Sequence, residues 1–142
     1  CEEVGVDGVI LPNLPLFENE TMYKELFENH GLLNVFLVTP QTSDERIHKL
    51  DEASEGFLYL VSSASTTGSN KVIIGVDDYL KRIQTMNLRS NTIVGFNIKD
   101  RTTFASACKY SNGGIIGSAF VKAIKNSEDL NKDISNFVET IK

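Results

Sequence analysis

The stretch that decides the fold is Gly113-Gly114-Ile115-Ile116-Gly117-Ser118-Ala119-Phe120-Val121, in which a short apolar run ends in Gly-Ser and passes directly into a helical pattern. Glycine lets a phosphate approach backbone amides closely, and the first N–H groups of a helix have no partner within the helix. A second strand-to-helix junction, 93–98, lies about one βα unit upstream. Either glycine alone is typical of a plain turn, but two such junctions at the last two strands predict a phosphate site.

Four further apolar runs precede this stretch, at 6–11, 33–38, 57–61 and 92–96. A helical pattern follows each of the five runs, and the last helix has apolar residues at 130, 134, 137, 138 and 141. The strands are apolar throughout rather than at alternate positions, which requires a parallel sheet covered by helices on both faces or closed into a barrel. The chain is therefore predicted to be a single α/β domain, 1–142.

Local patterns give more detailed expectations for the helices and one loop. The run 42–45 has the form of a capping box, and Asp100 is expected to cap the helix that follows 92–96. The side chains expected to face inward from their helices are Met22, Tyr23, Leu26, Phe27, Ile47, Leu50, Ala53, Phe104, Ala107 and Cys108. The run 62–70 consists of small and hydroxylated residues and is longer than the usual βα loop, so it is predicted to be a lid that becomes ordered over a ligand.

The length leaves two architectures open. A full eight-stranded barrel needs about 250 residues, so 142 residues provide roughly four and a half βα units. The chain is then either a small doubly wound domain or the back half of a barrel. In the flavodoxin-like alternative the phosphate loop usually follows the first strand, which here ends in Pro-Asn-Leu-Pro. The two glycine junctions at the last two strands favour the barrel.

Composition argues against several classes of partner. The net charge is −5 and the pI is near 5.0, so the overall field repels nucleic acid and anionic membranes. An anionic ligand has to be held by local amides, which suits a small phosphorylated metabolite. No apolar run approaches the roughly 20 residues that a bilayer requires, and a cytoplasmic location is expected. Cys1, Cys108, His30 and His48 have no metal-ligand spacing, so no metal site is expected.

Short motifs along the whole chain resemble those of one known family. They are Gly5-Val6-Asp7-Gly8-Val9-Ile10 with Leu14-Pro15, Tyr59-Leu60-Val61-Ser62, Thr67-Gly68, Gly95-Phe96 and Gly117-Ser118-Ala119. With them the chain resembles the alpha subunit of tryptophan synthase, from the fourth strand to the C-terminus. The resemblance implies a (β/α)8 TIM barrel, of which this chain forms the C-terminal five βα units. It also implies a lyase of tryptophan biosynthesis that cleaves indole-3-glycerol phosphate to indole and glyceraldehyde 3-phosphate.

The resemblance further implies roles for individual residues. The residues that resemble the phosphate cradle are Gly68, Gly95, Asn97, Gly117 and Ser118. The residues that resemble the wall around the indole ring are Leu37, Tyr59, Thr67 and Phe96. No cofactor is expected in this chain, because the family's PLP belongs to the beta subunit. That subunit receives the indole through a tunnel and is the expected partner.

Three places depart from the family's pattern. Asn13 stands where the family usually has an Asp near the partner interface, and 63–65 read Ser-Ala-Ser where an Arg followed by Ala-Gly is common. Asn97 stands where a glycine is common. Because Asn tolerates positive φ better than most residues, its amide is still expected to face the phosphate.

No catalytic residue is expected within this sequence. Retro-aldol cleavage needs one group to remove a hydroxyl proton and another to manage protonation at the indole, work suited to positioned carboxylates. In the family these carboxylates lie at the second strand and in the loop after it, regions that this sequence does not include. Its own acidic residues fit helix exteriors and caps. Two functions stay open: part of a lyase whose acid and base lie elsewhere, or a non-catalytic phosphate-binding half-barrel.

Overall fold

The computed structural model describes residues 1–12, 14–62 and 76–142. Three residues singled out above, Asn13, Thr67 and Gly68, lie outside the described residues, as does the predicted lid beyond Ser62. The strands are β1 (Gly8–Ile10), β2 (Leu33–Val38), β3 (Phe57–Val61), β4 (Asn91–Gly95) and β5 (Gly113–Gly114). The longer helices are α3 (Asp44–Ala53), α4 (Val76–Thr85), α5 (Arg101–Cys108) and α7 (Leu130–Ile141). The shorter helical elements are η1 (Glu2–Val4), α1 (Leu16–Glu18), η2 (Asn19–Tyr23), α2 (Lys24–Asn29) and α6 (Ser118–Ile124).

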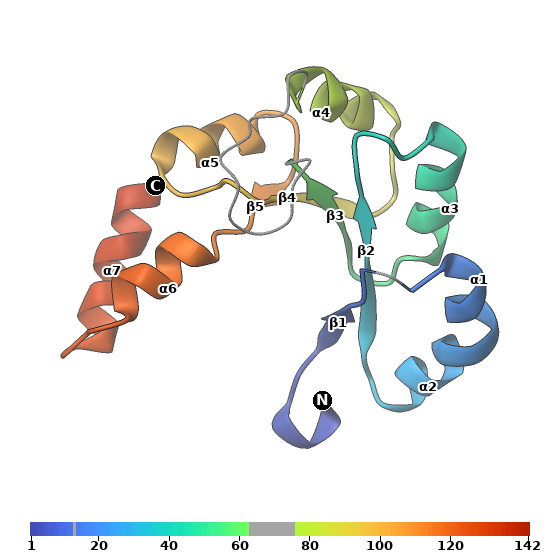
Figure 1. Ribbon diagram of the computed structural model, residues 1–142, viewed down its shortest axis with the longest axis horizontal. Coiled ribbons are helices and arrows are strands. Elements are labelled where there is room, and N and C mark those ends of the chain that lie inside the picture. The colour runs from blue at the N-terminus through green and yellow to red at the C-terminus, as the bar shows by residue number, and fades with distance from the viewer. Residues whose placement is uncertain (13, 63–75) are drawn as a thin grey trace.

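All five strands are parallel, and their order in the sheet is their order in the sequence, β1-β2-β3-β4-β5. A doubly wound domain would reverse its strand order at a switch point, whereas a barrel adds each strand beside the previous one. In Figure 1 the helices from α2 to α5 follow one another in an arc around one side of the sheet. The predicted α/β fold, a partial (β/α)8 barrel, is confirmed.

The two faces of the sheet are buried to different degrees. On β3 the residues alternate between half-buried and buried, and the buried Leu58 and Leu60 lie under the helices. The neighbouring rows continue this pattern, because Val38, Leu60 and Val94 are register partners that are at most 1% exposed. The other face carries half-buried apolar residues such as Tyr59 and Ile93. An apolar second face is what the inner side of a barrel requires.

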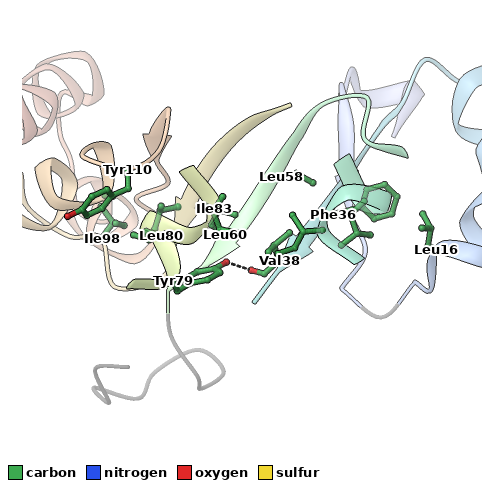
Figure 2. Close-up of a cluster of buried hydrophobic side chains, with 14 residues drawn as sticks. Leu16, Phe36, Val38, Leu58, Leu60, Tyr79, Leu80, Ile83, Ile98 and Tyr110 are labelled. Atoms are coloured by element: carbon green, nitrogen blue, oxygen red, sulfur yellow. Dashed lines mark hydrogen bonds between the residues drawn. The ribbon is translucent and has the colours of Figure 1, made fainter. Parts of the chain in front are cut away.

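The core is an elongated layer between the sheet and the helices. Figure 2 shows it running from Leu16 at one end to Tyr110 at the other. One polar contact crosses it, because the Tyr79 hydroxyl donates to the Val38 carbonyl at 2.9 Å. Burial raises the pKa of Tyr79, so this hydroxyl keeps its proton and remains a donor. The contact fixes the first turns of α4 against the carboxyl end of β2.

Some of the helix caps and inward-facing residues predicted from the sequence are confirmed, and others were wrong. Asp100 caps α5, as predicted, and forms a complete capping box with Thr103. The cap of α3 is Ser43, whose hydroxyl accepts from the Arg46 N–H, so the predicted box at 42–45 was wrong by one residue. Cys108 is exposed rather than inward, because it is the last residue of α5 and Ala107 occupies the buried position.

The first helical segment differs most from its prediction. Met22, Tyr23 and Leu26 are exposed in this chain, whereas the inward positions belong to Leu16 and Asn19. The cause is the π turn η2, which changes the number of residues per turn and rotates the apolar face away from the sheet.

Candidate functional site

Two loops leave the sheet at the same edge, after the neighbouring strands β4 and β5. The Ile115 N–H donates to the Val94 carbonyl at 2.8 Å, so the pairing of the two strands continues just beyond β5. Because parallel strands end at the same edge, the junction after Gly95 and the junction at Gly117 both lie on the carboxyl side of the sheet. Functional groups of α/β barrels gather at this edge.

The junction after β4 is a left-handed turn of two non-glycine residues. Phe96 has φ of 67° and Asn97 has φ of 60°. Asn occurs in this region more readily than most residues, whereas Phe does so rarely. The positive φ of Asn97 agrees with the tolerance of Asn for this conformation, and the expected direction of its amide toward a phosphate stays a prediction. Non-glycine residues in this region carry local strain, which the surrounding structure has to offset.

An apolar wall runs across the half-buried face of the sheet beside this turn. Leu37 and Tyr59 are direct register partners on β2 and β3, and Tyr59 in turn lies beside Ile93 on β4. The rings of Tyr59 and Phe96 meet edge to face, with centroids 5.8 Å apart and an interplanar angle of 70°. The structure therefore brings together three of the four predicted wall residues, and sequence reasoning missed Ile93.

Gly95 is required by its contact with Tyr59. A Cβ atom placed on Gly95 would lie 1.8 Å from the Tyr59 hydroxyl oxygen and 2.0 Å from Cζ. The hydroxyl thus lies directly over the backbone at the end of β4. Burial raises the pKa of Tyr59, and the backbone N–H of Phe96 partly offsets this effect. The phenol is therefore protonated near neutral pH.

The second junction exposes its backbone. Gly117 is the N-cap of α6, and both Gly117 and Ser118 are exposed. The φ of Gly117 is −94°, which any residue can adopt, and no heavy atom of the described structure lies within 4 Å of a Cβ placed there. Neither the turn nor packing within the described residues requires a glycine at this position. Close approach of a ligand to the backbone remains a physical reason for it.

The predicted phosphate-binding positions that the structure describes carry no charged side chain. The described cradle positions Gly95, Asn97, Gly117 and Ser118 include no Lys or Arg, and the nearest cation on α6 is the exposed Lys122. Among the described residues, no group of three or more His, Cys, Asp or Glu side chains is placed to hold a metal ion. None of the helices in the described ranges is long and apolar enough to cross a membrane.

Sequence reasoning also missed the contacts of Ser62, which follows β3. Its hydroxyl lies 2.7 Å from the Gly95 carbonyl oxygen and 2.6 Å from that of Phe96. Its backbone N–H also donates to the Gly95 carbonyl, at 3.2 Å. A serine directly after a strand, one strand away from the glycine junction, was the signal that could have identified it.

The fold and the position of this edge define a class of protein: a partial (β/α)8 barrel with backbone-lined loops at the carboxyl ends of its last strands. Comparison with known proteins specifies the family. The profile of the family "Tryptophan synthase alpha chain" matches residues 1–142. The chain belongs to this family.

Similar proteins carry the same name. The tryptophan synthase alpha chain of Christiangramia forsetii is 50% identical over 144 residues, which cover 100% of this chain and 55% of that protein. The alpha chain of Flavobacterium psychrophilum is 51% identical over 142 residues, covering 99% of this chain and 55% of that protein. The chain therefore spans about half the length of the curated relatives it matches.

Solved structures agree with the fold. The tryptophan synthase alpha subunit of Pyrococcus furiosus superimposes with a TM-score of 0.76 at 31% identity, covering 99% of this chain and 56% of that chain. A chain from the tryptophan synthase a2b2 complex of the same organism gives a TM-score of 0.76 at 31% identity, covering 99% of this chain and 57% of that chain.

Proposed function

We propose that this chain forms the phosphate-binding and indole-binding part of a tryptophan synthase alpha subunit. The whole protein would cleave indole-3-glycerol phosphate to indole and glyceraldehyde 3-phosphate. The observation that carries this proposal is family membership over residues 1–142 together with the wall of Leu37, Tyr59 and Phe96 beside the left-handed turn. The 142 residues act as one α/β domain, the C-terminal portion of the barrel.

The phosphate is assigned to backbone amides at the two junctions. Gly95, Asn97, Gly117 and Ser118 lie at the carboxyl edge of the sheet, and Gly68 belongs to the same assignment by resemblance to the family. Attraction comes from convergent N–H groups and the partial positive charge at the start of α6, worth about 0.3 to 1 kcal/mol beyond the hydrogen bonds. Without a cation among these residues, the affinity for phosphate alone is modest.

The indole ring is assigned to the half-buried face of the sheet. Leu37, Tyr59 and Phe96 offer one aliphatic and two aromatic surfaces there, and Thr67 belongs to the same wall by resemblance. Edge-to-face arrangements of aromatic rings with centroids about 4.5 to 7 Å apart are favourable, so a flat indole can pack against this wall. A substrate with an indole at one end and a phosphate at the other would span the wall and the turn.

The acid and base of the reaction are assigned outside these 142 residues. The described site offers apolar surfaces, hydroxyls and amides, whereas the cleavage needs positioned carboxylates. We therefore assign no catalytic residue to this chain and expect it to be inactive alone. A cytoplasmic location and the absence of a cofactor in this subunit belong to the same proposal.

The proposed partner is a beta subunit that carries PLP. The support is that a Pyrococcus furiosus relative forms an a2b2 complex. Partner coupling at Asn13 remains part of this proposal, because that residue replaces the acidic residue that the family usually has near the interface.

The test is indole release from indole-3-glycerol phosphate by the longest natural polypeptide that contains these residues. We expect turnover with that polypeptide and none above background with residues 1–142 alone. Tyr59→Ala in the longer polypeptide should raise KM by removing the wall. A longer polypeptide that folds and binds phosphate without turnover would favour the non-catalytic alternative, and turnover by the 142-residue chain would refute the assignment of the acid and base.

A further inference from the structure

The Ser62 hydroxyl contacts two backbone carbonyls beside the candidate phosphate site. Its Oγ lies 2.7 Å from the Gly95 carbonyl oxygen and 2.6 Å from the Phe96 carbonyl oxygen. A hydroxyl has one proton, so the two carbonyls share it, and the Gly95 carbonyl also accepts from the Ser62 backbone N–H at 3.2 Å. Two parallel carbonyl dipoles repel each other, and a hydroxyl between them offsets that repulsion.

The direction of these carbonyls determines where the following N–H groups point. In a planar trans peptide the C=O of one residue and the N–H of the next are antiparallel. Because the carbonyls of Gly95 and Phe96 both point at Ser62, the N–H groups of Phe96 and Asn97 both point away from it. The turn thus presents two neighbouring donors on one side, an arrangement that binds anions.

A Cβ atom placed on Gly95 would clash with the Tyr59 phenol, so the ring lies against the backbone that leads into this turn. Tyr59 lies on the half-buried face of the sheet with its register partner Leu37. The turn therefore lies beside the predicted indole wall.

We propose that Ser62 is a positioning residue of the candidate phosphate site, which holds the left-handed turn so that the N–H groups of Phe96 and Asn97 face the bound anion. Phe96 and Asn97 have φ of 67° and 60°, a conformation that their own side chains do not favour. The Ser62 hydroxyl stabilises this conformation from the side of the turn opposite to these two N–H groups. The inference rests on the proposed function, since it concerns the same phosphate site.

The chain offers a matched control in Ser111. Its hydroxyl also contacts two carbonyl oxygens, that of Ala107 at 2.8 Å and that of Gly113 at 3.0 Å. Ser111 is likewise partly buried, but it lies just before β5, at the opposite edge of the sheet. Removing either hydroxyl costs a similar pair of contacts, and only Ser62 is next to the left-handed turn.

The experiment is a titration of the longest natural polypeptide with inorganic phosphate, followed by NMR at the amides of Phe96 and Asn97. We expect Ser62→Ala to raise the dissociation constant about tenfold, equivalent to ~1.4 kcal/mol. We expect Ser62→Thr, which keeps the hydroxyl, and Ser111→Ala to stay within about twofold of the unmodified protein. Recovery of affinity in Ser62→Thr would identify the hydroxyl as the cause.

Two results would overturn the proposal: equal affinity in Ser62→Ala and the unmodified protein, or equal weakening in Ser62→Ala and Ser111→Ala. If the unmodified protein shows no shifts at Phe96 and Asn97 with phosphate, the proposed phosphate site itself is refuted and this inference with it. If Ser62→Ala does not fold, Ser62→Cys replaces it, because a thiol fits the site and is a weak donor. Unchanged affinity in that variant would equally overturn the proposal.

Discussion

The contact between Gly95 and Tyr59 makes a quantitative prediction about Gly95→Ala. The added Cβ would lie 1.8 Å from the phenol oxygen, 2.0 Å from Cζ and 2.3 Å from Cε1. All three atoms belong to one rigid phenol group, so the ring has to move as a unit. Such movement breaks its contact with Phe96, whose centroid is 5.8 Å away. Overpacking of about 1 to 3 kcal/mol and a lost aromatic pair of about 0.5 to 1.5 kcal/mol give an expected destabilisation of ~1.5 to 4.5 kcal/mol.

Urea unfolding of the longest natural polypeptide measures this cost. Gly117→Ala is the matched control, because the space around its Cβ is open in the described structure and its φ is ordinary. We expect that variant to stay within ~0.5 kcal/mol of the unmodified protein.

A double-mutant cycle tests the cause of the destabilisation. In a Tyr59→Ala background the ring is absent, so Gly95→Ala should cost less than ~1 kcal/mol, and the coupling between the two changes should exceed ~1 kcal/mol. Equal costs of Gly95→Ala in both backgrounds would refute the reasoning, because the clash would then not involve the ring.

Three further outcomes are expected. Asp51→Asn should cost ~1 to 3 kcal/mol of unfolding free energy near neutral pH, because the two carboxylate oxygens accept separate N–H groups, from Arg89 at 2.7 Å and Ser90 at 2.8 Å. Burial raises the pKa of Asp51, but the hydrogen bonds from these donors lower it by more, so the folded-state pKa lies below the usual value. In the unmodified protein this stabilisation is therefore present above about pH 4 and is lost as the pH falls through the lowered pKa. Measuring the unfolding free energy at decreasing pH checks this expectation. Tyr79→Phe should cost ~1 kcal/mol in urea unfolding by leaving the Val38 carbonyl without its donor. Residues 1–142 alone should self-associate through the exposed apolar edge at β1, and a monomer in sedimentation at micromolar concentration would contradict this expectation.

Local patterns predicted most elements correctly because their signals are local. Strands β2 and β3 have the predicted bounds, and Asp100 caps α5, because continuous apolar runs and a capping box are encoded in neighbouring residues. The wrong predictions concern which side chains of a helix are buried against the sheet. The π turn of η2 turned Met22 outward, and the end of α5 left Cys108 exposed.

Some features of the candidate site were likewise predicted from the sequence, and others were not. The sequence alone determined a parallel α/β chain, the family it resembles, and the glycine junctions after its last two strands. The positions of these junctions relative to one another depend on strand register, which pairs Val94 of β4 with Gly114 of β5. Only the tertiary structure brought the Ser62 hydroxyl against the carbonyls of Gly95 and Phe96, more than thirty residues away. Hydrogen bonds of this kind form between residues that are distant in sequence, so no local pattern encodes them, and they decide which way the amides at the site point.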